Sequence, residues 1–156
     1  MNDFFCGGVW DDWFDAGSGN DILVGDIGSD RHYGNDTLNG GADNDLLQGG
    51  WGQDVFVFGA NDGEDTIARI DLDEIDFDNI GNVPLTGPDF QSGVDKIHLE
   101  SAGFADLDGD SALALAAVSD VTVDGVTFAQ FDHNGTKINF HGLTLIDLSA
   151  SDFDFV

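Results

Sequence analysis

The chain has 156 residues, with 4 Lys and Arg against 31 Asp and Glu, and a formal net charge of −27. This charge excludes nucleic acid as a partner, because a polyanion needs a basic face, and it argues against binding to an anionic membrane surface. The chain has no run of about 18 apolar residues, so no membrane-spanning helix is predicted. The single cysteine, Cys6, excludes an internal disulfide framework.

The acidic residues are almost all aspartates. Only three of the 31 acids are glutamates, Glu64, Glu74 and Glu100. Glu is the better helix former, so an acidic helical surface would use it freely. Asp combined with 22 Gly residues is typical of turns and metal-binding loops. A halophilic surface is the alternative explanation of the acidity, but it would not explain a regular spacing.

A nine-residue repeat runs through the first third of the chain. Each unit has Gly-rich residues, then an Asp, then a short apolar triplet. The steps between the repeat aspartates are nine residues, except for a step of six after the fourth of them: Asp3, Asp12, Asp21, Asp30, Asp36, Asp45 and Asp54. The residue two places after each Asp is large and apolar in six of seven units, the exception being His32. Short strands separated by glycine turns predict a flattened coil of two units, with coils stacked as parallel strands about 4.8 Å apart.

Such stacking aligns the aspartates along the edges of the coil. Two carboxylates about 5 Å apart repel by roughly 3 kcal/mol at an effective dielectric constant near 20, so a stack of them needs cations between its members. Carboxylate and carbonyl oxygens select Ca²⁺, because Mg²⁺ prefers a tighter octahedron and keeps its waters. The sequence therefore predicts an all-β, parallel β-roll that binds calcium.

The repeat G-G-x-G-x-D-x-U-x, with U a large apolar residue, resembles that of the RTX, or haemolysin-type, calcium-binding proteins. The resemblance covers residues 1–57. It implies a nonapeptide-repeat solenoid with Ca²⁺ ions between loops. The earlier loop contributes the carbonyls of its second and fourth positions and its Asp, and the later loop contributes those of its first and third positions and its Asp. We expect three to five ions.

Carried onto this chain, the resemblance implies four sites and half of a fifth. The first joins Gly8, Trp10 and Asp12 to Gly25, Ile27 and Asp30. The second joins Asp26, Gly28 and Asp30 to Gly40, Ala42 and Asp45. The third joins Gly17, Gly19 and Asp21 to Asp36. The fourth joins Gly34 and Asp36 to Gly49, Trp51 and Asp54. The half site joins Asp3 to Ala16, Ser18 and Asp21.

Two departures from the pattern affect these sites. Trp10 and Asp43 stand at the fourth position of their loops, where the pattern has a glycine. Asp tolerates a left-handed backbone and Trp does so poorly, so we expect a distorted first site. Three residues are missing between Asp30 and Asp36, which predicts an irregular turn and a weakened third site. His32 then faces inward, either as a polar residue at a register defect or as a metal ligand.

After Phe56 the period stops, and residues 58–156 are expected to form a β-sandwich-like cap with antiparallel strands. The segments at 63–67 and 93–97 resemble the ends of β-rolls in serralysin-type proteases and alginate epimerase modules. Asp65 and Asp95 are accordingly candidate ligands of terminal sites, with a plain turn role as the alternative. Residues 71–92 are expected to form a loop insertion.

Two local elements are predicted within this cap. Residues 111–119 predict a short helix with Ser111 as its N-cap. Asn134-Gly135 predicts a two-residue hairpin that pairs Phe131 with Ile138 and Asp132 with Lys137.

Residues 145–156 resemble the close of the same roll modules and the uncleaved C-terminal signal of type I secretion. The resemblance implies a bacterial, extracellular module, exported by the type I machinery, that folds on Ca²⁺ and stabilises a larger secreted protein with an N-terminal catalytic or effector domain. The chain has no HExxH, GxSxG or Cys–His arrangement, so we expect the module to be non-catalytic. The alternative is a polysaccharide-binding module that uses Trp13 and Trp51, with acidic glycans disfavoured.

Overall fold

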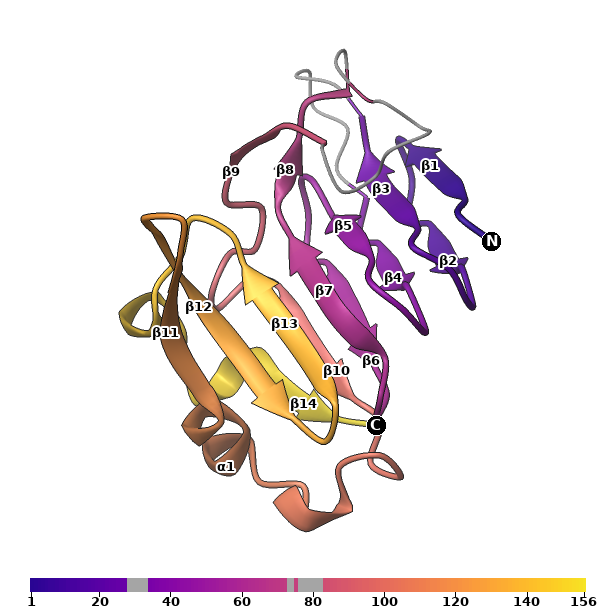
Figure 1. Ribbon diagram of the computed structural model, residues 1–156. Helices are drawn as coiled ribbons and strands as arrows, with labels where there is room; N and C mark the ends of the chain where they lie inside the picture. Colours follow the sequence, from indigo (N-terminus) through magenta and orange to yellow (C-terminus); the bar gives the residue numbers. More distant parts are fainter. Residues whose placement is uncertain (28–33, 73–74, 76–82) are drawn as a thin grey trace.

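The computed structural model describes residues 1–27, 34–72, 75 and 83–156. In this part of the chain the structure consists mainly of strands arranged in two large sheets (Figure 1). One sheet has seven strands in the order β1-β3-β5-β7-β13-β12-β11, and the other has five in the order β14-β10-β6-β4-β2. The prediction of an all-β chain with parallel sheets is confirmed.

The chain winds as a flattened coil. Each half turn contributes one strand, and successive strands alternate between the two walls. The odd-numbered wall is formed by β1 (Phe4–Gly8), β3 (Ile22–Asp26), β5 (Leu46–Gln48) and β7 (Gly63–Ile67). The other wall is formed by β2 (Trp13–Asp15), β4 (Thr37–Asn39), β6 (Val55–Phe58), β10 (Lys96–Leu99) and β14 (Phe153–Phe155). Every pairing within these walls is parallel.

The core of the coil is a single row of side chains from each wall. Each of these residues stands two places after an aspartate, and the alternation of a strand turns it inward while that aspartate stays at the turn. Six of them are completely buried: Leu23, Leu38, Leu47, Phe56, Ile67 and Ile97. Full burial of such a side chain stabilises the fold by about 1.5–3 kcal/mol, so this thin core depends on every coil being in register.

The coil that includes β3 and β4 contains an insertion, so the prediction of a shortened repeat is wrong. Ile22 pairs with Leu46, 24 residues on, and Trp13 pairs with Thr37 at the same offset, whereas the β1–β3 and β4–β6 pairs are offset by 18. Six extra residues therefore leave the coil between β3 and β4. The next strand follows Asp36, so that Leu38 takes the inward place that the shortened repeat assigned to His32. An apolar core selects this register.

The seven-stranded sheet continues into an antiparallel part. β13 (Thr136–Phe140) pairs in parallel with β7, and β12 (Val126–His133) and β11 (Val118–Val123) follow antiparallel. The predicted hairpin is confirmed, with Phe131 opposite Ile138 and Asp132 opposite Lys137. Asn134 and Gly135 both have positive φ, at 48° and 78°, which is the geometry that two-residue hairpins require.

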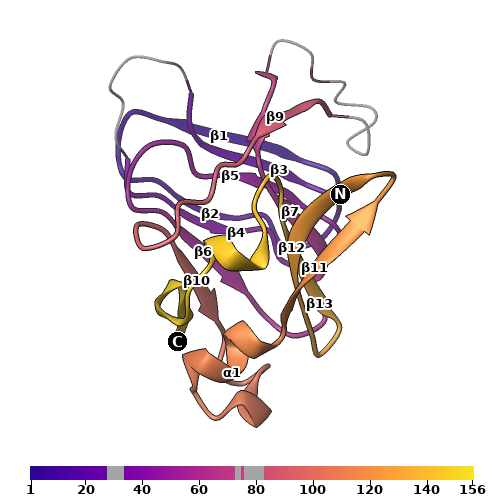
Figure 2. The same cartoon turned by 90° about the vertical axis from the view of Figure 1, so that its left-hand side faces the viewer.

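The helical elements with bounds among the described residues are short: α1 (Ser111–Ala116) and the single-turn η3 (Ala105–Leu107), η4 (Leu145–Asp147) and η5 (Ala150–Asp152). The helix α1 lies at the end of the molecule far from β1 (Figure 2). The N-cap of α1 is Asp110, not Ser111 as predicted, because the Asp110 carboxylate accepts from the Ala112 amide while the Ser111 hydroxyl donates to the Phe153 carbonyl. None of the helices in the described residues is long and apolar enough to cross a membrane.

The segment predicted as a loop insertion, 71–92, contains one short strand. β9 (Leu85–Gly87) pairs antiparallel with β8 (Arg69–Ile70), which follows β7 directly. The chain then returns to the coil through Asp95 at the start of β10.

Candidate functional site

Two columns of aspartates follow the two turn edges of the coil. The Asp45 ladder consists of Asp3, Asp21, Asp45 and Asp65, and the Asp54 ladder consists of Asp12, Asp36, Asp54 and Asp95. Within each ladder, the Oδ1 atom of one aspartate accepts a hydrogen bond of 2.7–3.1 Å from the backbone amide of the aspartate one coil earlier. Asp65 and Asp95, the two aspartates predicted from outside the regular repeat, thus occupy the last rung of each ladder.

In three of the ladder aspartates the second carboxylate oxygen has no such partner. The Oδ2 atoms of Asp21, Asp36 and Asp45 are buried and accept no hydrogen bond. A buried charged oxygen without a donor is costly, at about 1–3 kcal/mol or more. The ion pairs of the described residues join Asp154 to Lys96 and His98, and Asp106 to His133, so none reaches a ladder. These oxygens therefore call for a cation that the chain itself does not supply.

The first glycine of each loop creates the space for this oxygen. A Cβ atom at Gly40 would lie 2.2 Å from Oδ2 of Asp45, and one at Gly49 would lie 2.3 Å from Oδ2 of Asp54. A Cβ at Gly25 would lie 2.1 Å from Oδ2 of Asp36, eleven residues on instead of five. Asp36 is thus the aspartate of the loop that Gly25 opens, which agrees with the six-residue insertion.

The fourth loop position behaves as the sequence predicts. A Cβ at Gly52 would lie 1.7 Å from the Gly34 carbonyl oxygen, so only glycine fits there. Asp43 adopts the left-handed conformation, with φ of 87°. Trp10 is not among the residues with positive φ, so the first loop differs at this position from the loops of Gly19, Asp43 and Gly52.

The aspartates of one predicted site and of the half site are neighbours in the structure. Asp36 lies next to Asp54, with Gly34 beside the loop of Gly49 and Trp51. Asp3 lies next to Asp21.

The structure pairs the aspartates of the other three predicted sites differently, because Asp36 follows Asp12 on its edge of the coil. Asp12 is paired with Asp36, and Asp21 is paired with Asp45. Asp26 donates its amide to the Gly49 carbonyl, so it lies on the edge of the Asp54 ladder and not beside Gly40 and Ala42. Ile27 is 42% exposed. Gly28, Asp30 and His32 lie outside the described residues.

The loops thus gather most of the predicted residues on two separate edges. Gly8, Trp10, Gly25, Gly34, Gly49 and Trp51 lie in the loops of the Asp54 ladder, and Gly17, Gly19, Gly40 and Ala42 lie in those of the Asp45 ladder.

Backbone carbonyls complete the donor set of each edge. The carbonyls of Gly17, Ala42 and Gly49 each accept one hydrogen bond from an amide of the neighbouring coil, at 2.8–3.2 Å. A carbonyl oxygen has two lone pairs, so each retains an acceptor site for a cation. In the described part of the chain, no three His, Cys, Asp or Glu side chains are grouped so that they could hold a metal ion. An ion on either edge would take carbonyls as well as carboxylates, which is the chemistry of Ca²⁺.

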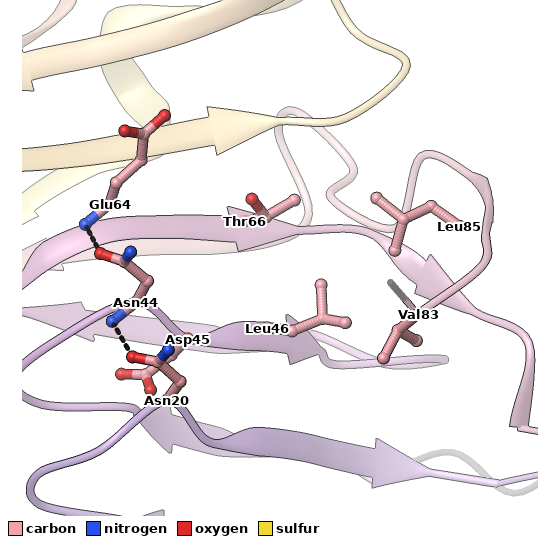
Figure 3. Close-up of a pocket in the computed structure, with 8 residues that line it drawn as sticks. All are labelled: Asn20, Asn44, Asp45, Leu46, Glu64, Thr66, Val83 and Leu85. Atoms are coloured by element: carbon pink, nitrogen blue, oxygen red, sulfur yellow. Dashed lines mark hydrogen bonds between the residues drawn. The ribbon is translucent and has the colours of Figure 1, made fainter. Parts of the chain in front are cut away.

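A second ladder, not predicted from the sequence, stands beside the Asp45 ladder. The side-chain oxygen of Asn20 accepts from the Asn44 amide, and that of Asn44 accepts from the Glu64 amide, at 3.1 and 2.9 Å (Figure 3). Asn35 accepts from the Gln53 amide in the same way on the other edge. These bonds satisfy turn amides that the coil leaves unpaired. The recurring Asn-Asp dipeptides at 20–21, 35–36 and 44–45 are the signal that identifies them.

Burial raises the pKa values of the buried ladder carboxylates. It raises the pKa of Asp36 to about 6, of Asp45 and Asp54 to about 7 and of Asp65 to about 9, against the lowering effect of the amide hydrogen bonds. The neighbouring carboxylates raise these pKa values further, for example Asp95 beside Asp54. Ionising these carboxylates at neutral pH without a bound cation therefore lowers the stability of the fold.

Residues 2–31 and 32–67 match the family described as RTX calcium-binding nonapeptide repeat (4 copies). This segment is similar to RTX calcium-binding repeats. The matched segment ends with β7, so it includes Asp65 as well as the regular repeats. RTX repeats are non-catalytic and bind calcium, which agrees with the oxygen-only donor set on both edges. No curated protein matches the chain.

Proposed function

We propose that this RTX segment folds when Ca²⁺ binds along the two aspartate ladders, and that it stabilises a larger secreted protein in this way. The observation that carries the proposal is the buried, unpartnered Oδ2 atom of Asp21, Asp36 and Asp45. At a net charge of −27, the Gly-rich repeats would be largely disordered without a cation. Binding and folding are then a single event, as in other small metallo-domains.

The free energy available from calcium is of the right size. At a calcium concentration of about 100 times Kd, one site contributes about 2.7 kcal/mol to stability. Four sites would contribute roughly 10 kcal/mol, comparable with the total stability of about 5–15 kcal/mol of an ordinary domain. We propose three to five ions, held by the ladder aspartates and the loop carbonyls of neighbouring coils.

The same coupling suits export by a type I system. Cytosolic calcium is scarce, so the chain would stay unfolded and exportable, whereas millimolar calcium outside the cell would fold it. Residues 1–57 then form the calcium-binding roll, and residues 58–156 close its end and carry the secretion signal at 145–156. In the structure, β14 lies within that signal and pairs with β10, so folding would withdraw it from the export machinery after secretion.

A calcium titration of the whole chain tests this function. Calorimetry should give three to five ions, and far-UV circular dichroism should show strand formation with the same midpoint. Mg²⁺ serves as the control and should produce little folding. Equal strand content in EGTA and in calcium would refute coupled folding.

Exposed tryptophans support polysaccharide binding as a second candidate function. Trp13 is 67% exposed and Trp51 is 48% exposed, as expected, and Trp10 is 78% exposed. Indole rings combine a large apolar face with a polar N–H group, which suits stacking on sugar rings. Calorimetry of the calcium-loaded chain with neutral and acidic glycans tests this function: neutral glycans should bind and W13A should weaken them, whereas no heat with either class would exclude it.

A further inference from the structure

Asp89 lies outside the repeat, yet its side chain enters the turn edge of the coil. It follows β9 in the segment between β8 and β10, and it is only 3% exposed. Its Oδ2 atom accepts hydrogen bonds from the backbone amides of Gly49 and Gly50, at 2.6 and 3.3 Å. Asp89 therefore contacts the last regular loop on the edge of the Asp54 ladder.

The hydrogen bonds to Oδ2 take the place of a contact with a further coil. In the preceding coil, the amide of Asp26 donates to the Gly49 carbonyl of the next loop. After Gly49 and Gly50 the described residues form no further regular loop on this edge, because the chain continues through β8 into the 71–92 segment. The Asp89 carboxylate supplies the acceptor that another loop would have supplied. This role needs only one of its two oxygens.

The other oxygen is buried without a hydrogen-bond partner. Oδ1 of Asp89 accepts no hydrogen bond. Oδ2 of Asp89 accepts from the Gly49 amide, and a Cβ atom at Gly49 would lie 2.3 Å from Oδ2 of Asp54, so the Asp89 and Asp54 carboxylates both lie at this glycine. Both oxygens of Asp95 are already used, by the amides of Asp54 and Gln91. Arg69 is the cationic side chain that acts on Asp89, and it forms no ion pair with it within 4.0 Å among the described residues.

We propose that Oδ1 of Asp89 is a ligand of a Ca²⁺ ion held together with Asp54 and backbone carbonyls at the end of the Asp54 ladder. The inference rests on the proposed calcium-binding function and extends it to a residue that the repeat does not encode. Asp89 uses one oxygen to satisfy the last loop and the other to bind the ion.

Calorimetric calcium titration of the whole chain with an Asp89→Asn variant tests this assignment. The amide oxygen of Asn still accepts from Gly49 and Gly50, but the charge is lost, so D89N should bind one ion fewer and leave the remaining ions unaffected. Asp15→Asn is the matched control, because Asp15 is exposed on β2 outside both ladders, and it should bind as the wild type does. A folded D89N variant with unchanged stoichiometry would reduce Asp89 to an amide acceptor and overturn the proposal.

Two further results keep the test decisive. If the wild-type chain binds no calcium, the proposed function itself fails, which is a different outcome from a failure confined to D89N. If D89N does not fold, a crystal structure of the calcium-loaded wild-type chain decides. An ion at about 2.3–2.6 Å from Oδ1 of Asp89 supports the assignment, and an ion-free Oδ1 contradicts it.

Discussion

At the scale of single residues, Asp21, Asp36 and Asp45 each perform two separable tasks. In each of them Oδ1 accepts the backbone amide of the previous coil, and Oδ2 is buried without a hydrogen-bond donor, where a cation can bind. An amide side chain can replace the first task but not the second. Substitutions at one aspartate therefore distinguish the contribution of packing from that of calcium.

Asp45 offers this comparison at a fully buried rung. Asp45→Asn should fold in saturating calcium but bind fewer ions or bind them more weakly. Asp45→Ala also leaves the Asp21 amide without its acceptor, so it should cost a further 1–3 kcal/mol or so. Urea unfolding in calcium measures both, with Asp15→Ala as the control. If D45A were no more harmful than D15A, the ladder would not be a stability determinant.

The first loop glycine should be equally sensitive for a steric reason. In Gly40→Ala, the new Cβ would lie 2.2 Å from Oδ2 of Asp45, so the carboxylate has to leave its position. We expect calcium affinity to fall at least tenfold, as measured by calorimetry. Gly59→Ala is the control, because its Cβ would come no closer than 3.1 Å, to the mobile end of Glu100. Similar affinities in the two variants would contradict the role of the glycine.

At the scale of elements, the sequence predicted what depends on short-range pattern. The inward residue two places after Asp, the left-handed Asp43 and the hairpin at Asn134 follow from local chemistry, and the structure confirms them. The register across the insertion was predicted wrongly, because the 15 residues from Asp21 to Asp36 fit two patterns equally well. They can be a nine-residue unit followed by a shortened unit of six, or one nine-residue unit with six inserted residues. The residue at the inward position distinguishes the two registers, because Leu38 is apolar and suits the core whereas His32 does not. Asp89 had no local signal, because its partners are about 40 residues away.

Deletion of residues 28–33 distinguishes the two registers. It joins Gly25-Asp26-Ile27 to Gly34-Asn35-Asp36 and so restores the six-residue loop spacing G-x-x-G-x-D. The shortened loop should keep the ion count, and stability should change by less than about 1 kcal/mol, because closure entropy varies slowly with loop length. Calorimetric unfolding in calcium and a calcium titration check this. Loss of folding would favour the register in which Asp30 is a rung.

At the scale of the whole molecule, protons and calcium compete for the same oxygens. The folded, metal-free chain holds the pKa of Asp36 near 6, of Asp45 and Asp54 near 7 and of Asp65 near 9, whereas an unfolded Asp has a pKa of about 3.9. Between about pH 4 and these values the folded state binds more protons than the unfolded state. The metal-free fold therefore loses stability as pH rises through this range.

The consequence has opposite signs with and without calcium. In EGTA, lowering the pH from 8 to 5 should increase strand content, because protonated carboxyls no longer repel one another along the ladders. In calcium, the same change should weaken ion binding, because each site must first release its protons. Circular dichroism in EGTA and calorimetry in calcium at matched pH values measure the two effects. A metal-free signal that stays flat from pH 8 to pH 5 would mean that burial of the ladder carboxylates does not control folding.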